Sequence, residues 1–489
     1  MIGALAFGRL DHRRVAILAS AVAGGGVAIA AGPELSPLVV AGAVLAMACA
    51  EWRRGVVVLL CALPFSGVPV FIAGAPGLAL RDLAIVLPIY ASFAFACTLP
   101  RGAEILPRAG VLLPALALFC LAVIVSIAAA PSLTVAAIGT KVWLVYLPML
   151  AIGYRYVRRI EDFDSVLRLT ALLGLVPALI ALAECIIASR AEHAVDPALL
   201  RNDFGPFRYL YGDWYSHVSA PVLSFYRPGG HIFVIARVPS TFTASTQYFA
   251  FAMVAFAAGL AQAMRAGSFR WTVCAALLAA GALAAGARLA YVLVPVTLVT
   301  AVAIGRPERR YALAVGGGVL AAAAAAVAAG ADVAGIVSLL PHHVAQQSAH
   351  ACGEFARALG TGAWGHGTGW DTNAALRYGD VAERRYIENW YAKAVLELGL
   401  GGLAAMVVAL AALHWRIASG LRRVSPDVRQ LAAPVAVVLG VMTIALFKGP
   451  YIDLDPLNVY YWLLAGMLLA VIRIGVRGDA TAPRTGEER

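Results

Sequence analysis

Charged residues are scarce in this sequence. They make up 13% of its 489 residues, whereas 61% of the residues are apolar. Soluble globular domains carry about 25% charged residues. The composition therefore excludes an ordinary soluble enzyme, and no polar stretch is long enough to form a large independent soluble domain.

Cysteine motifs are also missing. The chain has seven cysteines, but none has the C-x-x-C or Cys/His spacing of a zinc site, and only Cys352 lies in a polar stretch. This pattern argues against a disulfide framework and a zinc site. We expect no metal and no cofactor.

Long apolar stretches make up much of the sequence. A crossing of the hydrocarbon core needs about 20 residues, and fourteen candidate stretches can be marked. We predict an all-α, polytopic transmembrane bundle of about 12–14 spans, because the third stretch contains prolines and the ninth is short. The stretches are 15–31, 35–50, 55–73, 82–99, 111–129, 135–155, 166–188, 244–264, 271–286, 287–305, 311–331, 388–413, 430–448 and 456–474.

The polar segments between these stretches divide the chain into regions. The predicted regions are an N-terminal bundle (1–188), a first loop (189–243), four spans (244–331), a second loop (332–387), three spans (388–475) and a tail (476–489). Long loops are frequently functional, so we look for a site in the two long loops.

The positive charge predicts the orientation in the membrane. The formal net charge is +11, and the arginines gather in every second connection. By the positive-inside rule these connections are cytoplasmic. Both termini are then cytoplasmic and both long loops periplasmic in a bacterial inner (plasma) membrane. The charge thus reflects topology, and we expect no nucleic-acid partner. The arginines concerned are Arg53, Arg54, Arg101, Arg108, Arg155, Arg158, Arg159, Arg168, Arg265, Arg270, Arg306, Arg309, Arg310, Arg416, Arg422, Arg423 and Arg429.

A few cations lie where the positive-inside rule does not explain them. The only three lysines, Lys141, Lys393 and Lys448, lie within or at the outer ends of predicted spans. A cation at membrane depth is costly unless it is paired or faces water, so each lysine either serves function or extends to the interface. Three arginines flank the outer face, where they could bind phosphate oxygens or anchor the interface: Arg227, Arg237 and Arg288.

The two predicted loops contain further candidates. Aromatic and acidic side chains in the first loop suit sugar binding or an interfacial aromatic belt: Tyr209, Tyr211, Asp213, Trp214 and Tyr215. The second loop has a glycine-rich segment, 360–370, which lacks a P-loop ending, and we expect it to be a flexible loop that lines a site. His366 within it is either an acid/base or a solvated histidine.

Acidic residues mark the outer ends of two predicted spans. Asp453 and Asp455 form a D-x-D pair that could hold a divalent metal, although a turn before Pro456 is simpler. Glu388 opens the span at 388–413, where a carboxylate complements the helix N-terminus or acts as a general base. The sequence leaves both alternatives open.

The order of several motifs resembles the bacterial O-antigen ligase and polysaccharide polymerase (Wzy-type) family over residues 200–410. The motifs are Arg237-Val-Pro-Ser-Thr-Phe242, Gly286-Ala-Arg288, Gly365-His-Gly-Thr-Gly369, Glu388-Asn389-Trp-Tyr391 and Glu397-Leu-Gly-Leu-Gly401. The ligases carry His-Asn where this chain has Glu388-Asn389. This difference favours a polymerase over a ligase.

The resemblance implies a GT-C-like membrane glycosyltransferase at the periplasmic face. Its donor would be an oligosaccharide on undecaprenyl pyrophosphate and its acceptor a second glycan, with a flippase and a chain-length regulator as partners. Arg237 and Arg288 would bind the pyrophosphate, with help from Arg227, Lys393 and Lys141. Glu388, or else His366, would act as the base. The alternatives are a ligase acting on lipid A core or protein, and a transporter or flippase of lipid-linked glycan.

The orientation can be tested by labelling single cysteines in sealed cells. Ser216→Cys and Ala374→Cys should react with an impermeant thiol reagent from the periplasm, and Ser425→Cys should not, because the arginines mark its connection as cytoplasmic. Labelling of Ser425→Cys would contradict the predicted topology.

Overall fold

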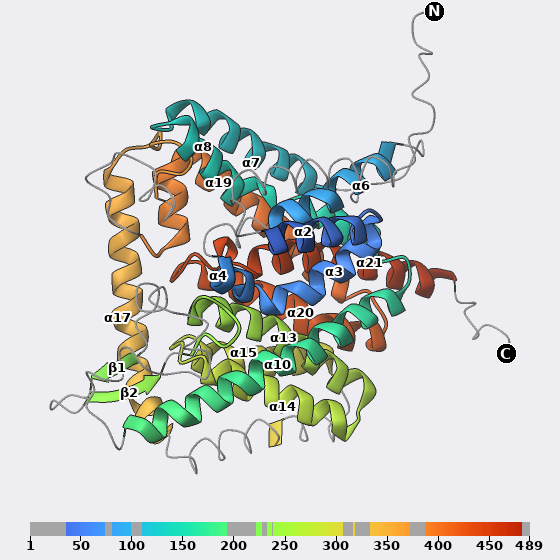
Figure 1. Ribbon diagram of the computed structural model, residues 1–489, viewed down its shortest axis with the longest axis vertical. Coiled ribbons are helices and arrows are strands. Elements are labelled where there is room, and N and C mark those ends of the chain that lie inside the picture. Colours follow the sequence, from blue (N-terminus) through green and yellow to red (C-terminus); the bar gives the residue numbers. More distant parts are fainter. Residues whose placement is uncertain are drawn as a thin grey trace, which may run out of the picture.

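The structure is a computed structural model that describes residues 36–73, 81–98, 110–192, 222–226, 232–236, 238–306, 316–317, 333–371 and 387–481. Within these ranges the chain forms a helical bundle with one small antiparallel hairpin (Figure 1). Strand β1 (Val222–Tyr226) pairs with β2 (Ile232–Ala236), with Ser224 opposite Val234. The helical class expected from the sequence is confirmed.

The helices and helical turns follow the predicted apolar stretches closely. Stretch 15–31 lies outside the described residues, and of stretch 311–331 only 316–317 are described. Each of the other twelve coincides with one or more helices. They are α2 (Ser36–Ala48), α3 (Trp52–Ala62), η2 (Leu63–Phe65), α4 (Gly67–Ala73), η3 (Asp82–Val86), α6 (Leu87–Thr98), α7 (Leu112–Ser126), η4 (Ile127–Ala129), α8 (Leu133–Thr140), η5 (Lys141–Val145), α9 (Met149–Tyr156), α10 (Ile160–Glu192), α13 (Ser245–Ala266), α14 (Phe269–Ala284), α15 (Ala290–Gly305), α19 (Trp390–Leu421), α20 (Pro426–Ala445) and α21 (Leu457–Thr481).

Seven helical segments of the described chain are long and apolar enough to cross a membrane. Three shorter apolar helices, Asp82–Cys97, α14 and α15, accompany them. The chain is therefore of the multi-pass membrane type. The seven segments are Leu112–Ala129, Leu133–Tyr156, Ile160–Cys185, Ser245–Ala266, Trp390–Leu421, Pro426–Ala445 and Leu457–Val476.

Prolines explain why stretch 55–73 is not one long helix. The α-helix α3 ends at Ala62, and Pro64 lies in the 3₁₀ turn η2 before α4 begins at Gly67. Proline has no N–H to donate and clashes with the preceding turn, so a helix is interrupted there. The other weak stretch, 271–286, forms the short helix α14, which has 16 residues.

The two predicted loops are not wholly irregular. Helix α17 (Val333–Gly360) occupies much of the second loop, and the hairpin lies in the first. Figure 1 shows α17 lying across one end of the bundle, transverse to α10 and α20. It packs against α19 and contacts β1. The second loop thus contributes a helix that covers the bundle end.

Helix α19 is broken at Gly399, whose φ of 74° and ψ of −178° are compatible with glycine alone. The segment 361–371, which shares all but Gly360 with the glycine-rich segment 360–370, fills the break. Its N–H groups donate to the carbonyls of Leu396 and Glu397 at 2.6 and 3.0 Å, and the Leu400 N–H donates to a carbonyl of the segment at 2.9 Å. The segment therefore satisfies backbone groups that the break exposes, as a bilayer requires.

The Glu397 carboxylate fixes the end of the same segment. It accepts the Trp143 indole N–H at 2.6 Å and the backbone N–H groups of Gly369 and Asp371 at 3.0 Å each. Glu397 is fully buried. A buried carboxylate with three donors is well compensated, so these contacts fix the end of the segment, and the flexibility expected from its composition stays a prediction.

Arginine contacts join several helix termini at one end of the bundle, which we call the basic end. Arg53, at the start of α3, donates to the carbonyls of Arg155 and Tyr156 at the end of α9 at 3.0 and 2.8 Å. Arg168 and Arg265 both pair with Asp164 at 2.8 Å, joining the start of α10 to the end of α13. Because the helices run in alternating directions, the connections 285–289 and 446–456 and the start of α19 lie at the opposite end.

The break in α19 can be tested with two glycines in the same helix. A Cβ at Gly399 would meet the Ala363 carbonyl oxygen at 2.6 Å, whereas a Cβ at Gly401 would meet no atom within 4 Å. Gly399→Ala should lower the melting temperature in detergent by several degrees. Gly401→Ala, the control, should leave it unchanged or raise it slightly, because alanine favours the helix by about 1 kcal/mol. Equal melting temperatures for both variants would contradict this account of the break.

Candidate functional site

A pocket of about 710 Å³ opens at the end of the bundle away from the basic end. Arg288, Lys448 and Glu388 supply its charged side chains, and His350 also lines it. Its other walls are largely apolar and include Val292, Leu293, Ile444 and Phe447. We call it the site pocket. Of the predicted site residues, Arg288 and Glu388 thus lie around one cavity although they are 100 positions apart in sequence.

A sharp turn between α14 and α15 brings Arg288 to the pocket. Gly286 has a φ of 65°, and its N–H donates to the Leu283 carbonyl at 3.2 Å. Glycine adopts this left-handed conformation without steric cost. The Ala290 N–H then donates to the Ala287 carbonyl at 2.9 Å as α15 begins. Arg288 is half-buried within this turn.

Glu388 lies at the start of α19, and Asn389 is the N-cap of that helix. The Asn389 side-chain oxygen accepts the N–H groups of Tyr391 and Ala392 at 3.0 and 3.1 Å. A cap of this kind stabilises a helix by about 1 kcal/mol. The Asn389 side chain thus caps the helix, and the neighbouring Glu388 side chain lines the pocket.

A buried carboxylate from α17 holds the same helix start. Glu354 accepts the N–H groups of Glu388 and Asn389 at 3.1 and 3.0 Å, and His350 lies 3.4 Å from Glu354. The Asn389 amide also donates to the Ala351 carbonyl at 3.0 Å. These contacts fix the position of Glu388 relative to α17. Glu354 was not singled out from the sequence, because nothing local distinguishes it from a solvated helical glutamate.

Lys448 reaches the pocket from the connection that follows α20. It forms an ion pair with Glu388 and is about one-third exposed. The Trp390 N–H donates to the Leu446 carbonyl at 2.9 Å, which ties the start of α19 to the end of α20. Lys448 was a sequence candidate without an assigned role. The structure adds it to the charged groups of the pocket.

The connection 446–456 is held by two acidic residues. Asp453 forms an ion pair with Lys393 and accepts the Trp390 indole N–H at 2.8 Å. Asp455 forms an ion pair with the buried Arg81. Each acid of the D-x-D pair thus has a cationic partner, and no group of three or more metal-ligating side chains occurs in the described ranges.

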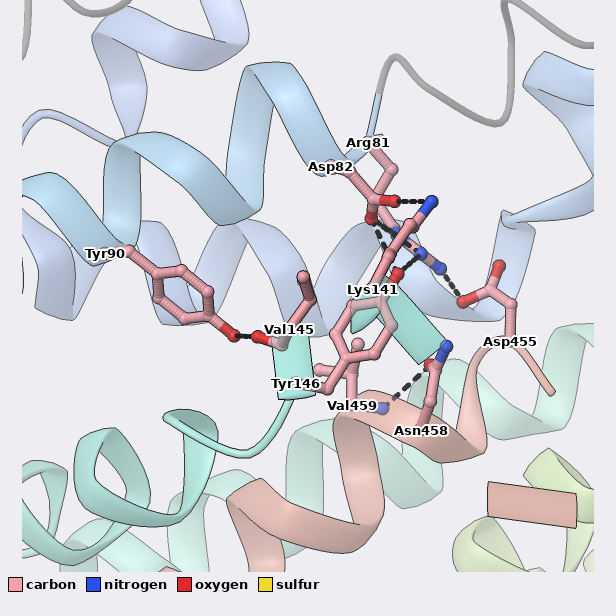
Figure 2. Close-up of polar contacts among 9 residues, drawn as sticks. All are labelled: Arg81, Asp82, Tyr90, Lys141, Val145, Tyr146, Asp455, Asn458 and Val459. Carbon is pink, nitrogen blue, oxygen red and sulfur yellow. Dashed lines mark hydrogen bonds and ion pairs between the residues drawn. The ribbon is translucent and has the colours of Figure 1, made fainter. Parts of the chain in front are cut away.

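Lys141 and Lys393 lie outside the site pocket. Lys141 pairs with Asp82 at 2.5 Å, and Asp82 also accepts from Arg81 at 2.7 Å and from Tyr146 at 2.9 Å (Figure 2). The Lys393 ammonium also lies 5.3 Å from the centre of the Trp143 ring. Both lysines therefore have paired charges, and their proposed contact with pyrophosphate stays a prediction.

Several predicted site residues lie outside the described ranges. The segment after Arg237 is described, and it is firmly held. The Ser240 N–H donates to the Glu184 carboxylate at 3.0 Å, and the Thr241 hydroxyl to the Pro64 carbonyl at 2.5 Å. The residues outside are Arg227, Arg237, Tyr209, Tyr211, Asp213, Trp214 and Tyr215.

His366 is described and lies apart from the site pocket. Its ring stacks on Trp370 with centroids 4.8 Å apart, and its backbone N–H donates to Leu396 in the break of α19. This position supports a packing role for the side chain. A catalytic role for His366 stays a prediction.

Asp371 predicts a pH dependence of stability. Burial raises the pKa of its carboxyl to about 8, opposed by the Lys393 charge and reinforced by the Glu397 carboxylate. The folded state therefore keeps a proton that the unfolded state has lost above its pKa of about 4. Stability should fall as the pH rises towards 8, by about 2 kcal/mol between pH 6 and pH 8.

The measurement compares the wild type with Asp371→Asn in detergent across this pH range. The amide cannot ionise, so the variant should lack this loss of melting temperature. Solvent-exposed Asp427→Asn is the control and should keep the wild-type pH dependence. Parallel curves for wild type and Asp371→Asn would show that Asp371 is already ionised at pH 6.

The sequence matches no protein-family model, and it has no match among curated proteins. The interpretation of the site therefore rests on its own geometry. That geometry is a half-enclosed pocket with two cations, one carboxylate and one histidine, set against apolar walls at one end of a membrane-type bundle.

Proposed function

We propose that this protein is a membrane glycosyltransferase that joins lipid-linked oligosaccharide units into a surface or exo-polysaccharide at the periplasmic face. The observation that carries the proposal is the site pocket, which combines Arg288 and Lys448 with Glu388 and apolar walls. A polyprenyl pyrophosphate donor needs all three features. Its phosphates need cations, its isoprenoid chain needs an apolar surface, and its acceptor needs a base.

The charge distribution supports a periplasmic position for this pocket. Arginines gather at the opposite, basic end of the bundle, where Arg53, Arg168 and Arg265 join helix termini. The positive-inside rule assigns such an end to the cytoplasm. The pocket would then open at the periplasmic leaflet.

The placement of ion pairs favours a transferase over a transporter. Ion pairs occur at both ends of the bundle, with Lys448–Glu388 at one end and Arg265–Asp164 at the other. A transporter would be expected to carry ionisable groups near the bilayer midplane. The described chain therefore offers better support for chemistry at one face.

In the proposed mechanism the pocket side chains take separate roles, and no metal takes part. Arg288 and Lys448 would bind the pyrophosphate and stabilise the charge that develops on the leaving group. Glu388 would take the proton from the attacking sugar hydroxyl. Donor phosphates would compete with Glu388 for Lys448, so donor binding would release the carboxylate from its ion pair.

Deleting the gene from its host tests the proposal directly. Single repeat units should accumulate on polyprenyl pyrophosphate, and the surface polymer should be lost, as shown by mass spectrometry of extracted lipids. A finished polymer trapped on its lipid would instead identify a ligase, with transfer to lipid A core or protein. Unchanged lipid-linked and surface glycans would reject both activities.

Glu388→Gln tests the base in purified protein supplied with lipid-linked glycan from the deletion strain. Turnover should fall by about 10²–10⁴-fold, because the amide cannot accept a proton. Donor binding should change little. Glu51→Gln is the control, since Glu51 forms an ion pair with Arg54 at 2.9 Å outside the pocket. If Glu388→Gln keeps more than about a tenth of the rate, the base lies elsewhere, with His366 and Asp213 as candidates.

A further inference from the structure

A second cavity, of about 840 Å³, lies between α15, α19 and α20 towards the basic end. We call it the arginine groove. Its walls are mainly apolar and include Ile304, Ile417 and Val437. Arg306, Arg422 and Arg429 also line it, and no acidic side chain is among its described lining residues. The groove therefore combines an apolar surface with three arginines for which no ion pair is found among the described residues.

Packing of the helix ends brings the three arginines together. A Cβ on Gly305, the last residue of α15, would lie 3.6 Å from the Cα of Gln430 in α20, so Arg306 is close to the start of α20. Arg429 donates to the carbonyls of Leu421 and Val424 at 3.0 and 2.9 Å, which fixes it beside the end of α19. Arg422 is the next residue after α19.

The neighbouring Arg423 provides a comparison at the same connection. Arg423 is exposed at the same connection but is not among the residues lining the groove. The Arg429 guanidinium is held by neutral carbonyl groups, and it has no ion pair with a described acidic residue. Like charges in one cavity repel each other. An anion bound among them would relieve this repulsion.

The His414 side chain, further along the groove, has hydrogen-bond partners within the bundle. His414 lies within hydrogen-bonding distance of the Thr443 hydroxyl at 2.8 Å and the Tyr461 hydroxyl at 3.0 Å. Arg422 follows His414 by eight residues, so it lies about 12 Å from His414 along the helix axis. An amphiphile would thus meet cations at the basic end and apolar side chains further along.

We infer that the arginine groove binds an anionic phospholipid, with its phosphate among Arg306, Arg422 and Arg429 and an acyl chain along the apolar wall. Basic pockets between transmembrane helices on the cytoplasmic side suit anionic headgroups. The site is separate from the proposed catalytic chemistry. The groove and the site pocket share the exposed Ile444, so a lipid here lies against the same face of α20 that forms the pocket wall.

Gly440 offers a way to fill the groove without disturbing the bundle. It lines the cavity within α20, and a Cβ built on it would meet no atom within 4 Å. Leucine also favours helix over glycine. Gly440→Leu should therefore fold normally and occupy the space of the acyl chain.

Native mass spectrometry of the purified full-length protein tests the site, with phosphatidylglycerol as the probe and phosphatidylcholine of the same acyl chains for comparison. Wild type should bind phosphatidylglycerol more tightly than phosphatidylcholine. Arg306→Gln combined with Arg422→Gln should weaken phosphatidylglycerol binding by about 25-fold, at about fivefold for each arginine. Arg423→Gln is the matched control and should bind like wild type. Gly440→Leu should prevent binding.

Three results would overturn the inference. The double variant could bind phosphatidylglycerol like wild type, the two phospholipids could bind equally, or the groove could hold a polyprenyl phosphate that phosphatidylglycerol does not displace. Should the double variant fail to fold, each single substitution and Gly440→Leu give the same tests. Arg429 is left unchanged, because its hydrogen bonds to Leu421 and Val424 hold the connection between α19 and α20.

Discussion

The need to satisfy every backbone hydrogen bond within a membrane-type bundle governs the architecture around the site. Helix α19 is interrupted at Gly399, which would leave backbone N–H and C=O groups without helical partners. The segment 361–371 enters the break and bonds to both sides of it. The first turns of α19 therefore form a separate short helix, whose direction is set by this segment and by α17.

That arrangement determines where Glu388 lies. The carboxylate of Glu354 on α17 accepts the N–H groups at the start of α19, and Asn389 caps the first turn. Ion pairs then tie the connection 446–456 to the same region, through Asp453 to Lys393 and through Asp455 to Arg81. These buried charges are costly to separate, because removing one partner leaves the other uncompensated. They place Lys448 and Glu388 together in one pocket, where the two side chains form an ion pair.

The two cavities differ in the charged side chains that line them, and each suits a different kind of anionic ligand. The site pocket carries Arg288 and Lys448 next to a carboxylate, which suits an anionic substrate that also has to react. The arginine groove carries cations without a carboxylate, which suits an anionic ligand that is only bound. Helix α15 contributes to both cavities from its two ends, so the two cavities share a structural element.

The sequence by itself determined the helical class, the positions of the apolar helices and the clustering of arginines at alternate connections. These features depend on local composition, because a membrane crossing needs a continuous apolar stretch. The weak stretch at 55–73 was also predictable, since Pro64 interrupts a helix wherever it occurs. The expectation that Arg288 and Glu388 face one end of the bundle followed from the same alternation.

Only the tertiary structure decided which partners these residues have. Nothing in the sequence pairs Lys393 with Asp453, joins Glu354 to the start of α19, or fits residues 361–371 into the break at Gly399. These contacts join positions that are tens of residues apart, and they exist because buried donors and charges must find partners in the packed bundle. Local composition sets where such groups occur, whereas packing sets which of them meet.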